Sequence, residues 1–393
     1  GSGAALRVDV SGRDRWAELR TATDDVFASL DERRETGVVA PRVRLFGGAS
    51  FHPSVEDILW QPFGSASFVL PRWSYGVKGN DAFLRFALRV DQEVDRAAVL
   101  TEIEAVTASL ERTPERLSRT SQAVASSTPP ADETELTGLI ERALAAIAKG
   151  ELDKVVVARR ASIATAVSVD ATFAKLRAKN PESTAFSFTR GGSTFLGASP
   201  ERLVFSNGTR IVTEALAGTI ARREDDDEAA KAELFASDKE RREHQIVVGG
   251  ITRALAAFTR GIDAPSKPNV RTLGRVHHLS TPIVAQLQGS VHVLLLVEAL
   301  HPTPALAGLP KTAAFDWIEE HEPFERGWYG APVGWLDSSG EGAFAVAIRS
   351  ALVTPNRAWL FAGGGIVRGS EPEAELRETS LKLRTMSEAL VRA

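Results

Sequence analysis

Strand-like segments in this sequence follow one another through short turns more often than through helices. Residues 83–90 alternate apolar and polar side chains with a period of two, as a half-buried strand does. Asn207-Gly208 predicts a tight hairpin that leads into a strand at 210–214. Because parallel strands need long crossover connections, this spacing favours antiparallel sheets over a doubly wound parallel sheet.

The remaining segments complete an α+β prediction: large antiparallel β-sheets packed together, with helices on the outside. Further strands are predicted at 42–46, 67–70, 153–164, on both sides of 199–201, near 291–298, and at 331–336, 343–353 and 358–362. Helices are predicted at 97–112, 136–149 (stopped by Gly150), 171–179, about 229–258 as one long helix, and 373–391.

A stretch over 118–134 is rich in Ser, Ala and Thr and contains Pro129-Pro130, which is typical of an exposed linker. We therefore predict a β-rich N-terminal segment at 1–125, a linker at 126–135 and a main region at 136–393. The first segment is expected to pack on the same fold as the main region.

Charge and composition exclude several classes of function. The net charge is -4, so no basic field exists to attract nucleic acid or anionic lipid. The absence of Cys excludes disulfides, thiolate catalysis and Cys-ligated metals. The longest aliphatic stretch, 291–300, is too short to cross a bilayer. We expect a cytoplasmic protein without nucleic-acid or membrane partners, and a monomer, since no extended apolar helix or exposed strand demands a partner.

Several charged residues stand where charge is costly. Lys154 opens an apolar strand, Glu201 follows the turn residue Pro200, and Arg349 ends the apolar run 344–348. A partly desolvated Lys near cations is a candidate general base, and a Glu in an anion-binding site is a candidate acid. The alternatives are a strand-end Lys that reaches water, an edge-strand Glu, and an Arg in an internal salt bridge.

Glu375, Glu378 and Lys382 are spaced to lie on one stripe of the last helix. Alone, this spacing also fits a surface Glu378–Lys382 pair. Glu243, on the apolar side of the long helix, is a second source of carboxylate, unless it is solvated at the charged end of that helix. Carboxylates from two elements would suit Mg²⁺, which usually takes one or two of them together with water and substrate oxygens.

The glycine run 363–369 resembles a dinucleotide-binding fingerprint, but its last Gly comes one place too late and the βαβ setting is missing. Glycines after a strand still let backbone N–H groups approach a carboxylate closely, which applies to Gly363 and to Gly218. His278 is a candidate hydrogen-bond donor to a substrate, with a structural histidine as the alternative.

These signals occur in an order that resembles the chorismate-utilising enzyme family, specifically its isochorismate synthases. The matching segments cover 136–393: 152–159, 197–201, 216–219, Glu243-His244, 278–282, 300–308, 328–335, 361–367 and 375–379. The N-terminal segment matches only loosely. The resemblance implies an enzyme that acts on chorismate.

The resemblance also implies the chemistry. Glu243 and Glu378 would ligate Mg²⁺, with Glu375 close by or acting through water. Lys154 would activate a water for attack at C2 of chorismate, and Glu201 would protonate the departing C4 hydroxyl. A base and an acid on either side of the ring are needed because water is a poor nucleophile and hydroxide a poor leaving group.

The substrate has two carboxylates, and the resemblance assigns five residues to them. Arg349, Lys382 and His278 would contribute side chains, and Gly218 and Gly363 would contribute backbone groups. A planar guanidinium is well suited to bidentate capture of a carboxylate.

Three positions distinguish members of the family. Members that use ammonia generally have Gln where this chain has Lys154, and the aminodeoxychorismate type usually has Lys where Ala217 stands. Salicylate synthases, which also eliminate pyruvate, usually have Thr at the position of Ala305. The sequence thus favours an Mg²⁺-dependent isochorismate synthase, with a salicylate synthase as the alternative. A silent homologue that binds without turnover is disfavoured by the intact set of charged residues.

Overall fold

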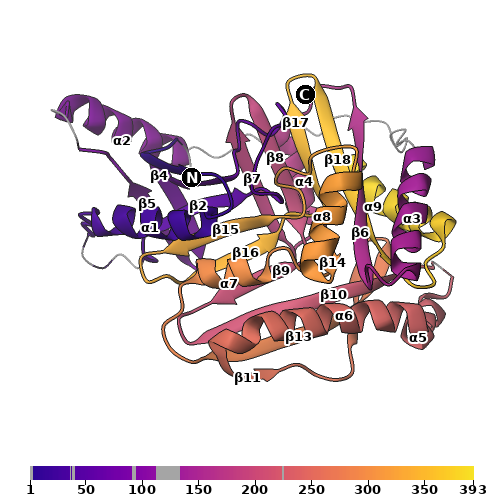
Figure 1. Ribbon diagram of the computed structural model, residues 1–393. Coiled ribbons are helices and arrows are strands. Elements are labelled where there is room, and N and C mark those ends of the chain that lie inside the picture. The colour runs from indigo at the N-terminus through magenta and orange to yellow at the C-terminus, as the bar shows by residue number, and fades with distance from the viewer. Residues whose placement is uncertain (1–2, 36, 38–39, 91–93, 112–132, 224) are drawn as a thin grey trace.

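Two antiparallel sheets form the framework of the computed structural model, which describes residues 3–35, 37, 40–90, 94–111, 133–223 and 225–393 (Figure 1). The larger sheet has the order β1 (Leu6–Val10), β3 (Ala66–Leu70), β2 (Arg44–Ala49), β15 (Pro332–Asp337), β16 (Gly342–Val346), β9 (Arg202–Ser206), β10 (Arg210–Ala221), β13 (Val276–Leu287) and β11 (Thr259–Asp263), and β12 (Asn269–Leu273) also pairs with β13. The predicted antiparallel α+β class is confirmed.

The smaller sheet has six strands and carries much of the predicted site. Its order is β14 (Gly308–Leu309), β6 (Lys154–Ile163), β18 (Arg357–Val367), β17 (Ser350–Thr354), β8 (Ser193–Ser199) and β7 (Thr184–Arg190). The centre of this sheet is the long β6–β18 ladder, which runs from the Lys154↔Val367 pair to the Ile163↔Ala358 pair. Lys154 therefore lies opposite the end of the glycine-containing strand β18.

Helices cover the outer faces of the two sheets (Figure 1). They are α1 (Arg15–Ala28), α3 (Glu133–Ala148), α4 (Val169–Lys179), α5 (Asp227–Ala236), α6 (Asp238–Leu255), α7 (Val293–Leu300), α8 (Lys311–His321) and α9 (Pro372–Ser387), with a short 3₁₀ turn at Ala256–Phe258. A largely aromatic core that includes Trp60, Phe195, Trp328 and Phe361 fills the space between the sheets. In the described residues, no helix is both long and apolar enough to cross a membrane.

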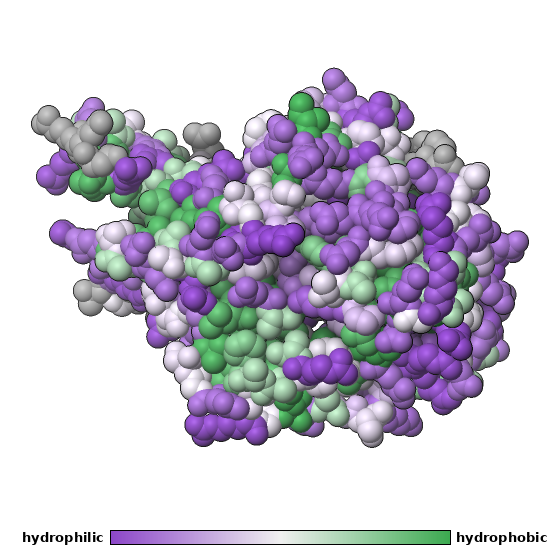
Figure 2. All heavy atoms as spheres, viewed as in Figure 1, coloured by the Kyte–Doolittle hydropathy of each residue, from purple (hydrophilic) through white to green (hydrophobic). Residues whose placement is uncertain are grey.

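An N-terminal arm projects from the body at the upper left of Figure 1. It consists of the hairpin β4 (Trp73–Lys78) and β5 (Asp81–Phe86) and the helix α2 (Arg96–Glu111). Tyr75 and Val77 on the hairpin are 55% and 62% exposed, and hydrophobic atoms lie on the arm's surface in Figure 2. The monomer prediction assumed that no exposed strand demands a partner, and this hairpin is an exposed strand pair that the prediction did not take into account. The oligomeric state itself stays a prediction.

The predicted long helix at 229–258 is in fact two helices, α5 and α6. Ser237 separates them and caps α6, because its Oγ accepts a hydrogen bond from the Glu240 N–H. The sequence contains the signal that we missed: Ser237 followed three residues later by Glu240 is the pattern of a capping box.

The predicted strand near 291–298 is also wrong, because this segment forms the helix α7. Periodicity cannot separate a short apolar run in a strand from one in a buried helix. The side chain of His292 accepts a hydrogen bond from Leu294 N–H and so caps the helix start. Helices α1 and α8 and the strands β1, β4, β7, β11, β12, β13 and β14 were not predicted.

Two boundaries also differ from prediction. The single strand expected at 343–353 is divided into β16 and β17, which belong to different sheets. Residues 126–132 of the predicted linker lie outside the described residues, and Glu133 to Glu135 form the start of α3. The N-terminal strand β2 pairs directly with β15 of the main region, while the division into domains stays a prediction.

Candidate active site

The site lies where the chain passes twice from one sheet to the other. Glu201 sits between β8 of the smaller sheet and β9 of the larger one, and Arg349 sits between β16 and β17. The two connections touch: Val346 N–H donates to Glu201 C=O at 3.0 Å, and Ala198 N–H donates to Arg349 C=O at 3.2 Å. Glu201 and Arg349, which are far apart in sequence, are thus brought to the same place by the backbone.

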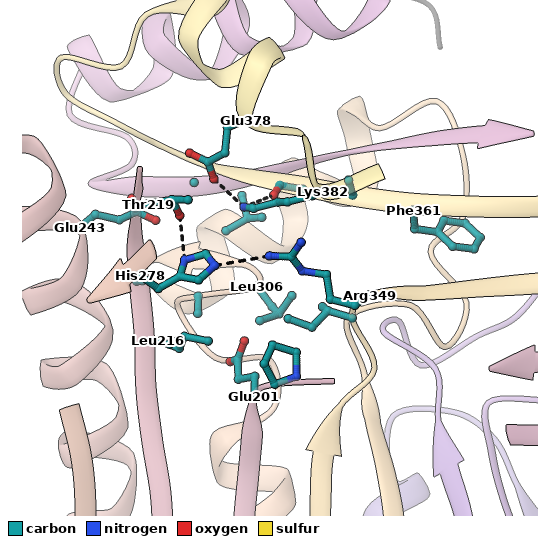
Figure 3. A pocket seen from close by; sticks show the side chains of 18 of the residues that line it. Glu201, Leu216, Thr219, Glu243, His278, Leu306, Arg349, Phe361, Glu378 and Lys382 are labelled. Atoms are coloured by element: carbon teal, nitrogen blue, oxygen red, sulfur yellow. Dashed lines mark hydrogen bonds and ion pairs between the residues drawn. The ribbon is translucent and has the colours of Figure 1, made fainter. Parts of the chain in front are cut away.

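A cavity of about 680 Å³, counted to its open mouth, lies beside these connections (Figure 3). Seven of the ten predicted site residues line it: Glu201, Glu243, His278, Arg349, Gly363, Glu378 and Lys382. The three that do not are Lys154, Glu375 and Gly218. Tyr329, Leu216, Ile348 and Phe361 contribute apolar surface, so the cavity combines a hydrophobic lining with a few convergent charges, as small-molecule sites do.

Lys154 lies just behind the cavity wall and is 0% exposed. Its Nζ donates a hydrogen bond to Glu243 Oε1 at 2.9 Å, so the buried Glu243 has the cationic partner that burial requires. The alternatives of a Lys154 that reaches water and a solvated Glu243 are therefore wrong. A Cβ on Gly365 would lie 2.3 Å from Glu243 Oε1. A larger residue at this position of strand β18 would therefore clash with the Glu243 carboxylate.

The stripe on helix α9 faces inward rather than toward solvent. Lys382 Nζ lies 2.5 Å from Glu378 Oε1 and also donates to the Gly363 C=O at 2.8 Å. The predicted pair therefore exists, but on the cavity wall and not on the surface. Burial alone would raise the pKa of Glu378, but Lys382, with Lys239 and Thr219, holds this pKa below its ordinary value.

Lys239 is a member of this cluster that we did not predict. Its ammonium lies 2.9 Å from Glu240 Oε1 and 2.8 Å from Glu375 Oε1, so it joins α6 to α9. Burial would lower the pKa of Lys239, but the two carboxylates raise it. The sequence did contain a signal for this role, because Lys239 is four residues before Glu243 and therefore lies on the same face of the helix.

The carboxylates of α6 and α9 have the right chemistry for a hard cation. Glu240, Glu243, Glu375 and Glu378 are close enough that burial and neighbouring carboxylates raise the pKa values of Glu240 and Glu375. The described part of the chain offers no hydrogen-bond partner to the buried Glu375 Oε2. In the part of the chain that the structure describes, no three His, Asp or Glu side chains are arranged as a ready-made metal site. Lysines hold these carboxylates instead.

Glu201 is buried and differs from the carboxylates on α6 and α9. It is 5% exposed, and burial together with the nearby Glu214 carboxylate raises its pKa to about 8, although Lys154 and Lys382 oppose this. The carboxyl group is therefore mostly protonated at neutral pH. The alternative of an edge-strand Glu at the surface is wrong.

Arg349 has an unusual backbone and, within the described ranges, no anionic partner. Its φ of 51° is in the left-handed region, which non-glycine residues rarely adopt. Among the described residues, no carboxylate lies within ion-pair distance of its guanidinium, so the internal salt bridge considered above is wrong. Burial lowers its pKa from the ordinary value. The guanidinium is available to bind an anion in the cavity.

His278 and the unpredicted Thr219 connect these groups. His278 Nδ1 lies 3.0 Å from Thr219 Oγ1, and His278 Nε2 lies 3.4 Å from Arg349 Nη2 (Figure 3). Gly218, with φ 79°, forms a β-bulge that displaces Thr219 in the ladder, and Thr219 N–H donates to Glu240 Oε2 at 2.7 Å. Direct contact of Gly218 or Gly363 backbone groups with a carboxylate stays a prediction.

Comparisons with known proteins agree with this geometry. The family model described as "Chorismate binding enzyme" matches residues 1–391. The chain is 38% identical over 395 residues to the salicylate biosynthesis isochorismate synthase of Pseudomonas aeruginosa, covering 99% of this chain and 82% of that protein. It is 37% identical over 382 residues to the isochorismate synthase MenF of Bacillus subtilis, covering 96% of this chain and 80% of that protein.

Solved structures show the same fold. The menaquinone-specific isochorismate synthase MenF of Escherichia coli superposes with a TM-score of 0.78 at 33% identity, covering 98% of this chain and 84% of that one. Anthranilate synthase component I of Streptococcus pneumoniae also has a TM-score of 0.78, but at 21% identity it supports the fold alone. By sequence over its full length and by structure, this chain belongs to the family of chorismate-binding enzymes.

Proposed function

We propose that this protein is an isochorismate synthase, which adds water at C2 of chorismate and removes the hydroxyl at C4. The observation that carries the proposal is that one cavity is lined by a protonated acid (Glu201) and by a guanidinium (Arg349) without an anionic partner in the described residues, and that the buried Lys154 lies directly behind its wall, on Glu243. The relatives named as isochorismate synthases, at 37 to 38% identity over nearly the whole chain, support the same reaction.

The reaction needs two proton transfers: one proton leaves the attacking water and one is added to the departing hydroxyl. Lys154 Nζ takes a proton from the attacking water, whose oxygen forms the new bond to C2. Glu201 gives a proton to the C4 hydroxyl, which departs as water, so substrate and product have the same composition. Lys154 can accept a proton only as a neutral amine with a free lone pair, so it has to lose a proton before each turnover. The neutral amine still has hydrogens with which to keep its hydrogen bond to Glu243.

Arg349 and Lys382 hold the substrate in this scheme. The guanidinium, which lacks a carboxylate partner in the described residues, binds one substrate carboxylate, and the ammonium of Lys382 lies across the cavity from Glu201 (Figure 3). The apolar side chains of Leu216, Ile348 and Phe361 exclude bulk water around the ring.

We further propose that Glu243 and Glu378, with Glu375 beside them, bind Mg²⁺. The unpartnered Glu375 Oε2 and the raised pKa values of neighbouring carboxylates support this proposal, since both indicate more negative charge than the lysines neutralise. When bound, the cation would offset the charge of a dianionic substrate. We also propose a cytoplasmic location, which the Cys-free sequence fits.

A salicylate synthase would carry out the same step and then eliminate pyruvate. Ala305, at the position where such enzymes usually have Thr, lies on the cavity wall, which supports release of isochorismate. The Pseudomonas aeruginosa relative carries "salicylate biosynthesis" in its name but is itself named an isochorismate synthase.

Product analysis tests the proposal. Purified protein is incubated with chorismate, with and without Mg²⁺, and the products are separated by chromatography. We expect Mg²⁺-dependent isochorismate without pyruvate. Salicylate together with pyruvate would identify the alternative enzyme, and unchanged chorismate in both samples would identify a binding protein without turnover.

A further inference from the structure

A row of polar groups crosses the cavity from Arg349 through His278 to Thr219 and Glu378 (Figure 3). The proposed reaction does not require Thr219, and His278 was predicted to donate a hydrogen bond to substrate. His278 can donate to substrate only if one of its ring hydrogens is free, so the positions of the hydrogens in this row have to be established.

The direction of each contact follows from the donors and acceptors present. An Arg guanidinium only donates, so His278 Nε2 has to accept from Arg349 Nη2. Burial lowers the pKa of His278 well below its ordinary value, and Arg349 and Lys382 add to this effect, so the ring is neutral and carries one hydrogen. That hydrogen is therefore on Nδ1, facing Thr219 Oγ1 at 3.0 Å.

The contacts of Thr219 agree with this direction. Its hydroxyl also interacts with the Glu378 carboxylate and lowers the pKa of Glu378. Because a carboxylate only accepts, the Thr219 hydroxyl hydrogen points to Glu378 and its lone pair is left for the His278 Nδ1–H. The Gly218 C=O is a second acceptor beside the same ring.

We propose that Thr219 is a positioning residue that fixes His278 as the neutral Nδ1–H tautomer, so that Nε2 receives a hydrogen bond from Arg349 and orients its guanidinium toward the substrate carboxylate. His278 then has no hydrogen to give to substrate, and its role is to orient Arg349. This orientation is needed because, in the described part of the chain, His278 is the only side chain that hydrogen-bonds the Arg349 guanidinium.

The tautomer can be measured directly on the free protein, independently of the proposed reaction. In protein labelled with ¹⁵N-histidine, two-bond ¹⁵N–¹H correlations identify which ring nitrogen carries the hydrogen, and His278→Gln assigns the signals. We expect a protonated Nδ1 and an unprotonated Nε2 at pH 7. A protonated Nε2, either as the other tautomer or in a charged ring, would overturn the proposal.

Matched substitutions at Thr219 test the cause. Thr219→Val keeps the side-chain shape and the backbone N–H that bonds Glu240, but removes the hydroxyl. We expect the Nε2–H form of His278 to become populated in Thr219→Val and the Nδ1–H form to persist in Thr219→Ser. Unchanged signals in Thr219→Val would show that the Gly218 carbonyl alone fixes the ring.

A kinetic measurement, which rests on the proposed function, completes the test. The assay is run at saturating Mg²⁺, so that any effect of the substitution on metal binding through Glu378 does not contribute. We expect Thr219→Val to raise KM for chorismate about tenfold, which is the effect of losing one hydrogen bond to a charged group. We expect kcat to stay within about threefold of the wild-type value. Thr219→Ser should restore KM. A fall in kcat at unchanged KM would contradict the proposal, whereas inactive wild-type protein would refute the proposed function and leave the NMR result standing.

Discussion

The cavity wall built by β6, α6 and α9 buries its charges in pairs, whereas the wall built by the two sheet connections buries Glu201 and Arg349 singly. On the paired wall, Lys154 holds Glu243, Lys382 holds Glu378, and Lys239 holds both Glu375 and Glu240. On the connection wall, Glu201 is kept neutral by its raised pKa, and the only side-chain hydrogen bond of the Arg349 guanidinium to another described residue is with His278.

This difference predicts opposite consequences for stability. Removing one member of a buried pair leaves its partner charged and uncompensated, which is strongly destabilising. Removing a group that is buried alone eliminates a desolvation cost and leaves no partner behind. Both walls are needed for the proposed chemistry, so a substitution on either wall should lower activity. On the paired wall the same substitution should also lower stability, whereas on the connection wall it should raise stability.

The largest effect is expected for Lys154→Met on the paired wall. Loss of the base should lower kcat roughly 10²–10⁴-fold, and loss of the ammonium should lower the free energy of unfolding by about 3–5 kcal/mol because Glu243 is left unpaired. Steady-state kinetics and urea denaturation measure the two effects. The double variant Lys154→Met/Glu243→Gln should regain stability without regaining turnover, and unchanged kcat in the single variant would remove Lys154 from the mechanism.

Glu201→Gln on the connection wall should lower kcat about 10²-fold, because the amide cannot protonate the departing hydroxyl. In the wild type, the pKa of Glu201 near 8 predicts a rate that falls above about pH 8 as the acid loses its proton. The pH profile of kcat/KM measures this limb, which should be absent from the residual activity of the variant. Retention of wild-type rates would exclude Glu201 as the acid.

The sequence predicted the residues of the two walls better than it predicted the walls themselves. Charged residues in apolar surroundings, such as Lys154 and Arg349, could be identified because burial of charge is costly wherever it occurs. The pairing of Lys154 with Glu243 could not be predicted, because these residues are 89 positions apart and no local periodicity relates them. The fold class followed from turn spacing, which is a local property.

The connection wall shows the limit most clearly. The run at 343–353 has the pattern of one continuous strand, but the chain leaves one sheet after Val346 and enters the other at Ser350. Arg349 therefore lies in a connection with a positive φ, a conformation that only the contacts of the folded molecule impose. Thr219 was missed for a related reason, because its role depends on a bulge at Gly218.

Glu378→Gln sharpens the comparison within the paired wall. Loss of a carboxylate that we propose to bind Mg²⁺ should raise the Mg²⁺ concentration for half-maximal activity about tenfold. Glu375→Gln is the matched variant on the same helix and should have a smaller effect, since Glu375 does not line the cavity. Mg²⁺ titrations of activity, with isothermal titration calorimetry of Mg²⁺ alone, measure both. Identical titrations for wild type and Glu378→Gln would contradict the ligand role.

The effect that separates the walls most directly is the stability of Glu201→Gln. The folded-state pKa of Glu201, about 8, is above the ordinary value of 4.5, so its contribution to stability is fully present below pH 4.5 and is lost as the pH rises through 8. A neutral Gln does not titrate. The variant should therefore gain about 3 kcal/mol relative to wild type between pH 5 and pH 8, although it has lost activity. Urea denaturation of both proteins across this pH range measures the difference in their free energies of unfolding. The contributions of the other titrating groups are the same in both proteins and cancel in this difference. A variant that becomes relatively less stable as the pH rises would mean that the Glu201 carboxylate is paired, and the distinction between the two walls would no longer hold.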